Sequence, residues 1–380
     1  MIPDIQFLSK LPISGHGTTE MRCVQPARYL EHAGWSASVG CVYRTMPHAR
    51  RAIVFHRVMA DPMGLRAMRL ARAMECRVVY DVDDLLFDGA ASAHLARFTS
   101  ELESDLMVAG YRQAMELSDT VICSTTYLRD IAARFHPHVV VMKNGLSDKL
   151  IEVAQAKQRV RPVGSADVTL GYFSGSRHHD ADFAVVQQAL LKLMRDFPQT
   201  RLLLAGKLQF DPAFRSFGDR FEFREFVPYA QFLSMPGEVD INLVPLVHRD
   251  PFAQARSELK YIEAGVFGVP TVASPTHTYA EAISHGQTGM ICADEDWYET
   301  LLHLVADTDL RKTLGQAARR DVIENHGPAQ RVGEWDKLFR EVLQTGDLAQ
   351  KGQAVLPDRL RQRVDINRRA LRRLLKSIKK

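Results

Sequence analysis

The chain has 380 residues, of which 46% are hydrophobic and 25% are charged. A chain of this length and composition can bury two cores of ordinary domain size, so we expect two globular domains. The formal net charge of +4 is unevenly spread, because residues 351–380 hold 11 Lys and Arg against 2 Asp and Glu. The first 350 residues are therefore mildly acidic, and the C-terminal tail is basic.

The cysteines and the apolar runs exclude several classes of protein. Five cysteines are scattered along the chain and never form a Cys-x-x-Cys spacing, which favours reduced residues in a cytosolic protein over disulfides or a zinc site. No run of about 18 apolar residues occurs, and the N-terminus lacks a basic segment followed by an apolar one. We expect neither a signal peptide nor a membrane-spanning helix.

In the first half of the chain, short β-rich runs alternate with amphipathic helical segments, the clearest at residues 93–117 and 128–135. This alternation favours a parallel sheet covered by helices on both faces, which is a Rossmann-like domain over residues 1–155. The strands expected there span residues 5–8, 36–43, 52–58, 77–81, 120–124 and 139–142.

A polar stretch at residues 155–167 breaks the pattern and indicates a linker. The alternation then restarts and predicts a second doubly wound domain over residues 166–327. Ligands of such sheets bind outside the carboxyl ends of the strands, so we expect the chemistry in a cleft between the two domains. The elements expected in this half are strands at 170–173, 201–205, 241–246, 271–273 and 290–292, and helices at 184–197, 257–266, 280–284 and 295–306.

The loop after the first strand contains Gly15 and Gly17. Glycines here allow the backbone to approach a ligand, and the start of the following helix attracts anions. A tight turn from strand to helix explains the same two glycines, and the spacing alone leaves both interpretations open.

Three carboxylates, Asp81, Asp83 and Asp84, stand at the end of the strand that begins at residue 77. Acids this close repel one another unless something compensates them. One alternative is a divalent metal held by an Asp-x-Asp motif. Another is that Asp83 or Asp84 caps the next helix.

The second domain opens with a strand followed by Gly175 and Arg177. Gly175 permits close approach, and the Arg177 guanidinium suits a diphosphate. The adjacent residues 178–180, His-His-Asp, point in different directions, so we interpret them as loop and helix-start polar residues and not as metal ligands. Lys207 ends the next strand and is either a second phosphate ligand or an exposed loop lysine.

Residues 257–274 form a charged helix that leads through Gly268 and Pro270 into a short apolar strand. Lys260 and Glu263 lie three residues apart on one helical face. A cation and a carboxylate so placed suit the phosphates and hydroxyls of a nucleotide sugar. An ordinary ion pair on a helix that Gly268 and Pro270 terminate is the alternative.

The run Lys-Tyr-Ile-Glu-Ala-Gly at 260–265, followed by Gly-Val-Pro-Thr-Val-Ala-Ser at 268–274, resembles the donor-site signature of glycosyltransferase family 4. These are two-domain enzymes of the GT-B fold, and the resemblance is strongest over residues 171–327. The Asp-x-Asp-Asp run at 81–84 resembles a subset that builds bacterial surface polysaccharides such as O-antigen or capsule. The resemblance implies retaining transfer of a sugar from a nucleotide diphosphate sugar to a saccharide acceptor, with no metal or other cofactor.

The resemblance also implies roles for particular residues. Glu263 would hold the ribose hydroxyls, and Lys260 and the backbone near Ser257 would hold phosphate. The remaining donor ligands would be Gly175, Arg177 and Lys207, with Gly15 and Gly17 over the donor phosphates and the acceptor.

Two positions depart from the family pattern. Asp83, followed by Asp84, stands where the family often has a catalytic-site histidine, so Asp83 would either accept the proton of the acceptor hydroxyl or only orient that hydroxyl. Ala255 stands where the family commonly has a glutamate that contacts the donor sugar. This departure makes a deoxyhexose an alternative to a hexose as the transferred sugar.

Residues 328–346 resemble the closing helix of the family, which packs back towards the first domain. Residues 357–380 place apolar side chains on one side and arginines around the rest, a pattern typical of a helix lying on an anionic membrane. This would suit a lipid-linked acceptor and a cytoplasmic protein at the inner face of the cytoplasmic membrane. A charged helix stacked on the protein is the alternative, and the body lacks a basic groove for nucleic acid.

Two other functions remain open from the sequence alone. A nucleotide-sugar epimerase of the same fold would need no acceptor. A non-catalytic scaffold descended from a transferase would explain the missing glutamate at Ala255.

Overall fold

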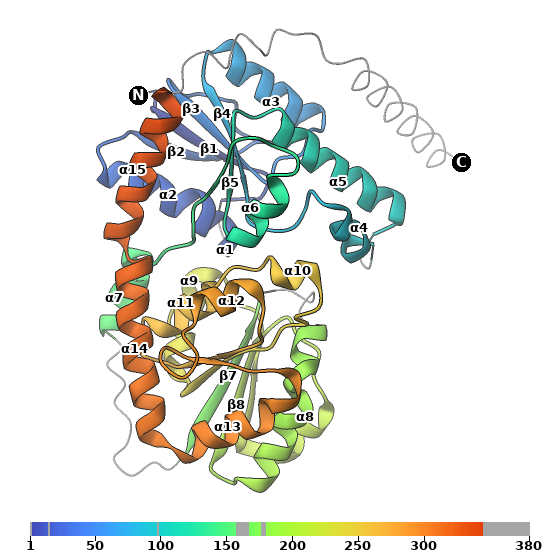
Figure 1. Ribbon diagram of the computed structural model, residues 1–380, viewed down its shortest axis with the longest axis vertical. Coiled ribbons are helices and arrows are strands. Elements are labelled where there is room, and N and C mark those ends of the chain that lie inside the picture. The colour runs from blue at the N-terminus through green and yellow to red at the C-terminus, as the bar shows by residue number, and fades with distance from the viewer. Residues whose placement is uncertain (1, 14–15, 97–98, 157–166, 176–179, 345–380) are drawn as a thin grey trace.

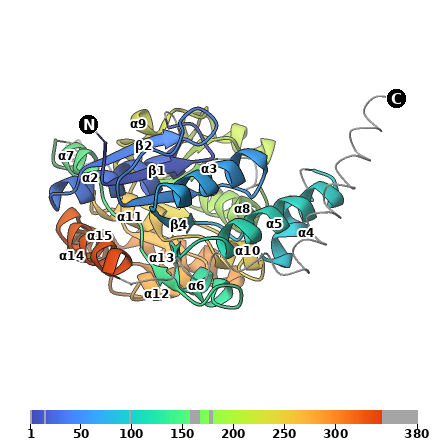
Figure 2. The same cartoon turned by 90° about the horizontal axis from the view of Figure 1, so that it is seen from above.

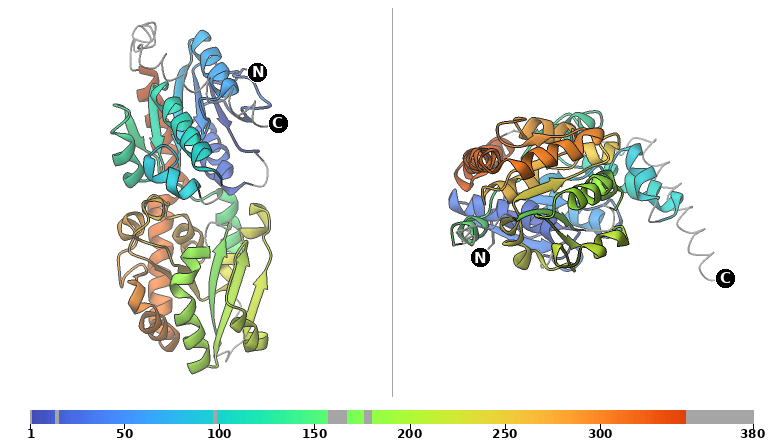
Figure 3. Two further views of the ribbon diagram at one scale, coloured as in Figure 1. Left: turned by 90° about the vertical axis from the view of Figure 1, so that its right-hand side faces the viewer. Right: turned by 90° about the horizontal axis from the view of Figure 1, so that it is seen from below.

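The structure, a computed structural model, describes residues 2–13, 16–96, 99–156, 167–175 and 180–344. It consists of two α/β domains stacked along the long axis of the molecule (Figures 1 and 3). Each domain is built on a six-stranded sheet, and every strand pairing is parallel. No helix in the described ranges combines the length and apolar character needed to cross a membrane.

The sheet of the first domain has the strand order β2-β1-β3-β4-β5-β6. Strands β1 and β3 are buried along their whole length, because helices cover both faces of the sheet. All six strands expected from the sequence are present. Their bounds are β1 Ile5–Ser9, β2 Ala37–Cys41, β3 Ala52–His56, β4 Arg77–Val82, β5 Thr120–Cys123 and β6 Val139–Val141.

One expectation for this domain is wrong, because residues 93–117 do not form a single helix. Helix α4 ends at Leu95, and α5 begins at Glu101. Ser100 and Glu103 form a capping box that starts α5 as a separate helix. The helices of the domain are α1 Gly17–Thr19, η1 Glu20–Val24, α2 Gln25–His32, α3 Pro62–Ala73, α4 Gly89–Leu95, α5 Glu101–Glu116, α6 Thr126–Ala132 and α7 Asp148–Ala156.

The sheet of the second domain has the order β12-β11-β10-β7-β8-β9. Its expected strands are present, and the structure adds the edge strand β9, whose residues alternate aromatic and charged. The strands are β7 Val168–Ser174, β8 Thr200–Gly206, β9 Phe221–Arg224, β10 Ile241–Val244, β11 Thr271–Ala273 and β12 Met290–Ile291. The helices are α8 Asp180–Asp196, η3 Pro212–Arg220, α9 Tyr229–Phe232, η4 Met235–Glu238, α10 Pro251–Gln254, α11 Leu259–Gly265, α12 His277–Ala282, η5 Asp294–Asp296, α13 Trp297–Ala306 and α14 Thr308–His326.

The chain crosses between the domains twice, and the two crossings bind each other. The Leu146 N–H donates to the His326 carbonyl at 2.8 Å, and His326 Nδ1 lies 3.2 Å from the Asn144 carbonyl. After the second crossing, helix α15, Pro328–Gln344, returns along the first domain. There the rings of Trp335 and Phe7 meet edge-on, with their centres 6.0 Å apart. Figure 2 shows α14 and α15 on one side of the molecule and α4 and α5 on the other.

Part of the predicted linker, residues 157–166, lies outside the described residues. The basic tail at 351–380 lies outside them as well, so its membrane interpretation is carried by the sequence alone.

Candidate functional site

A cleft of about 720 Å³ lies between the two domains. Residues from the carboxyl ends of both sheets line it, as expected for doubly wound domains. The first domain contributes a wall that contains Asp83 and Asp84, which we call the acidic wall. The second domain contributes a wall that carries residues of the 260–265 motif.

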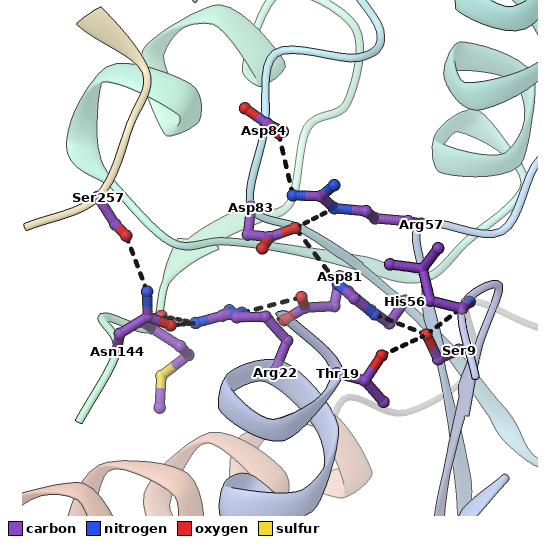
Figure 4. A network of polar contacts seen from close by, with 12 residues as sticks. Ser9, Thr19, Arg22, His56, Arg57, Asp81, Asp83, Asp84, Asn144 and Ser257 are labelled. Carbon is purple, nitrogen blue, oxygen red and sulfur yellow. Dashed lines mark hydrogen bonds and ion pairs between the residues drawn. The ribbon is translucent and has the colours of Figure 1, made fainter. Parts of the chain in front are cut away.

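The acidic wall is organised by Arg57, which follows β3 directly. Its Nε donates a short hydrogen bond to Asp83, and its Nη2 donates to Asp84 Oδ2 at 3.1 Å (Figure 4). His56 Nε2 lies 3.3 Å from the same Asp83 carboxylate. The φ of Arg57 is 51°, in the left-handed region that non-glycine residues seldom adopt. This strained backbone aims the guanidinium at both acids.

These contacts set the charge state of Asp83. Burial acts to raise its pKa, but Arg57 and His56 outweigh burial and hold the pKa well below its usual range. Asp83 therefore stays ionised at neutral pH and is a weak base. Asp84 differs, because burial raises its pKa against the opposing effect of Arg57.

Asp81, the third carboxylate of the cluster, points away from the cleft into the first domain. Its carboxylate accepts hydrogen bonds from Arg22 Nη2 at 2.7 Å and Nε at 3.1 Å. Both side chains are at most 1% exposed. The same guanidinium donates to the Met142 carbonyl at 2.6 Å and to Asn144 Oδ1 at 3.2 Å.

The carboxylates at 81–84 thus have arginine partners, which removes the repulsion expected from the sequence. No cluster of three or more potential metal ligands occurs within the described part of the chain. The helix-capping alternative is wrong, because the N-cap of the following helix is Asp88, whose side chain accepts from the Ala90 N–H.

On the opposite wall, Lys260 and Glu263 project into the cleft from α11. The Lys260 ammonium lies 4.5 Å from the centre of the Tyr172 ring. Burial lowers the pKa of Lys260 to about 8, and the charge of Arg256 acts in the same direction. Burial raises the pKa of Glu263 to about 7, against the Tyr229 hydroxyl and Lys260.

The raised pKa of Glu263 predicts a pH dependence of stability. Its neutral form contributes stability that is fully present below pH 4.5 and is lost as the pH rises through about 7. Between pH 5 and 8, the free energy of unfolding of the wild type should fall by about 2–3 kcal/mol more than that of Glu263→Gln. Denaturant titrations at both pH values measure this difference. The exposed control Glu324→Gln should follow the wild type, and parallel profiles for wild type and Glu263→Gln would contradict the prediction.

Three other predicted residues are placed in or beside the cleft. Gly175 and Gly17 line it, and a Cβ on Gly17 would lie 3.4 Å from the Tyr229 ring of the second domain. Ser257 also lines it, and its Oγ accepts a hydrogen bond from Asn144 Nδ2 at 2.9 Å.

Lys207 is not among the described residues that line the cleft, although its ammonium lies 4.9 Å from the ring centre of Phe226, which does line it. The preceding Gly206 has a φ of 111° and lines the cleft, and any Cβ there would collide with the Ser174 carbonyl oxygen. Gly15 and Arg177 lie outside the described residues.

Sequence reasoning missed Arg57, Arg256 and Tyr229, which all line the cleft. Arg57 could have been found, because it lies at the carboxyl end of the strand expected at 52–58 and so stands at the functional edge of the sheet. Ala255, where the family has a sugar-binding glutamate, is fully buried against the core of the first domain.

Two parallel-sheet domains that face each other across a cleft, with a closing helix that returns to the first domain, define the protein as one of the GT-B class. Residues 179–337 match the family model described as "Glycosyl transferase-like". The family match and the shared fold support a group 1 glycosyltransferase.

A curated relative is N-acetyl-alpha-D-glucosaminyl L-malate synthase of Bacillus anthracis, with 28% identity over 88 residues. That match spans 22% of this chain and 23% of the relative, less than a quarter of its length.

Solved structures share the fold at low identity. Sucrose-phosphate synthase from Thermosynechococcus elongatus has a TM-score of 0.62 and 17% identity, covering 89% of this chain and 99% of that one. Anabaena HepE, solved in complex with UDP-glucose, has a TM-score of 0.61 and 13% identity with the same coverage. WaaG, a glycosyltransferase involved in lipopolysaccharide biosynthesis, has a TM-score of 0.59 and 14% identity, covering 90% and 100%.

Proposed function

We propose that this protein transfers a sugar from a nucleotide diphosphate sugar to the hydroxyl of a saccharide acceptor. The observation that carries the proposal is that the walls of the first and the second domain face each other across one cleft. An ionised carboxylate, Asp83, faces the side on which Lys260 and Glu263 stand. The family match and the UDP-glucose bound by HepE support a nucleotide sugar as the donor.

In the proposed reaction, Glu263 holds the ribose and Lys260 neutralises the diphosphate, with Arg177 as a further phosphate ligand. The bond between the anomeric carbon and the diphosphate oxygen breaks, and its electron pair stays on the diphosphate. The acceptor oxygen forms the new bond to that carbon with retention of configuration. Because Asp83 stays ionised, it orients the acceptor hydroxyl, and the proton of that hydroxyl passes to the leaving diphosphate. We propose no metal or cofactor for this step, since side-chain cations meet the leaving group.

We further propose that the acceptor is lipid-linked, that the transferred sugar is a hexose or deoxyhexose, and that the product enters a bacterial surface polysaccharide such as O-antigen. The resemblance of residues 81–84 to enzymes of that kind supports this, and so does the likeness of the fold to WaaG. The basic residues 357–380 would then hold the protein at the inner face of the cytoplasmic membrane.

Thermal stabilisation by a panel of UDP, GDP, dTDP, CMP and their sugars tests the donor class. A ligand at about 100 times its Kd should add about 2.7 kcal/mol to the free energy of unfolding. One nucleotide diphosphate should stabilise the wild type and the exposed control Glu324→Ala, and should fail to stabilise Glu263→Ala. Absence of stabilisation by every member of the panel would contradict the proposal and favour a non-catalytic scaffold.

A further inference from the structure

Arg256 occupies a part of the cleft that the sequence motif does not describe. It lies in the short connection between α10 and α11, one residue after Ala255. Whereas Ala255 packs into the core of the first domain, Arg256 lines the cleft. The chain therefore presents a cation beside the position where the family commonly has a sugar-binding carboxylate.

The Arg256 side chain is held in place by an acid of the second domain. Its Nη1 donates to Asp182 Oδ2 at 2.6 Å, and the two side chains are 16% and 5% exposed. The other carboxylate oxygen of Asp182 accepts the Val247 N–H at 3.1 Å, which fixes the acid from a second direction. An arginine carries five N–H donors in a planar fork, so Asp182 can orient the guanidinium through one nitrogen.

Arg256 is close enough to residues of both walls to influence their charges. Its charge acts on Lys260 of the second domain and on Asp84 of the first domain. All three residues line the same cleft. This is the region in which a donor held by Lys260 and Glu263 would meet an acceptor hydroxyl held at Asp83.

Arg256 and Lys260 are neighbouring cations, and the two carboxylates that act on Lys260, those of Asp182 and Glu263, form no ion pair with it. Asp182 compensates Arg256, but among the described residues Lys260 has no carboxylate within 4.0 Å and instead faces the Tyr172 ring. Two adjacent, largely buried cations repel each other, and a doubly charged anion between them relieves that repulsion.

We infer that Arg256 binds the sugar-linked phosphate of the donor and stabilises the charge that builds on this phosphate as the sugar leaves, with Asp182 as the residue that positions it. The inference rests on the proposed function, because it names a ligand group of the same donor. A fixed guanidinium aimed at the leaving oxygen supplies its hydrogen bonds where charge develops. Lys260 would then contact the other phosphate.

Isothermal titration calorimetry with the full chain tests this assignment. The ligands are the nucleoside diphosphate that stabilises the wild type, the matching monophosphate and the nucleoside. Arg256→Gln should weaken binding of the diphosphate about 10- to 100-fold, and binding of the monophosphate and the nucleoside should stay within about twofold. The exposed Arg249→Gln, seven residues earlier, is the matched control and should bind all three like the wild type.

Each outcome decides a separate question. Unchanged diphosphate affinity in Arg256→Gln, or equal weakening of all three ligands, would overturn the role of Arg256 while leaving the proposed function intact. If the wild type binds no nucleoside diphosphate, the proposed function fails and the inference fails with it. Arg256→Gln could fail to fold, because the buried Asp182 loses its arginine partner. In that case Asp182→Asn with Arg256→Gln removes both charges, and the same loss of preference for the diphosphate is expected.

Discussion

Replacement of Asp83 by asparagine should lower the rate of sugar transfer about 100- to 1,000-fold while leaving the Kd of the nucleotide sugar within about twofold. Asp83 lines the first-domain wall of the cleft, and the 260–265 motif lies on the opposite wall, where we propose that the donor binds. The substitution keeps the size of the side chain and removes the charge that Arg57 and His56 hold in place. Single-turnover rates with a saturating donor measure the effect.

The pH dependence separates the two roles open to Asp83. Because the pKa of Asp83 lies well below the usual range, Asp83 does not titrate between pH 5 and 9. If it only orients the acceptor, it therefore adds no pH dependence to the transfer rate in this range. A fall in rate below pH 6 that disappears in Asp83→Asn would instead identify it as the general base. Asp130→Asn, at an exposed position of α6, is the matched control and should transfer sugar at the wild-type rate.

The strands were predictable because most of them are short, buried apolar runs bounded by polar turns. Strand β9 was missed because it lies at the edge of its sheet, where phenylalanines alternate with charged residues and give no continuous apolar run. The break between α4 and α5 was missed for a local reason. The amphipathic pattern continues across it, and only the capping box at Ser100 and Glu103 marks the new start.

The placement of Lys260 and Glu263 in the cleft was predictable, because both residues lie in one contiguous motif. The contacts of the acidic wall were not predictable, because they join residues that are distant in the sequence. Arg57 meets Asp83 and Asp84 only because β3 pairs with β4, which sets His56 beside Asp81. The strand order needed to see this cannot be read from hydrophobic periodicity.

The buried pair of Arg22 and Asp81 gives the largest expected effect on stability. Arg22→Met should lower the free energy of unfolding by about 3–5 kcal/mol, because it leaves an uncompensated carboxylate in a side chain that is 0% exposed. Lys192→Met is the control. It breaks an ion pair of similar length whose side chains are 53% and 39% exposed, and it should cost less than about 1 kcal/mol. A loss below about 1 kcal/mol in Arg22→Met would contradict the prediction.

Arg22→Met combined with Asp81→Leu separates stability from function. Removing both charges should recover most of the lost stability, because a buried pair replaced by apolar side chains leaves no unpaired charge. The affinity for the nucleotide, which we expect the loss of Arg22 to lower, should not recover in the double variant. Arg22 donates to Asn144 Oδ1, and this contact turns the amide nitrogen of Asn144 towards Ser257, two residues before α11. Without Arg22 the amide is free to flip, so the double variant should bind the nucleotide about threefold to tenfold more weakly than the wild type at equal stability.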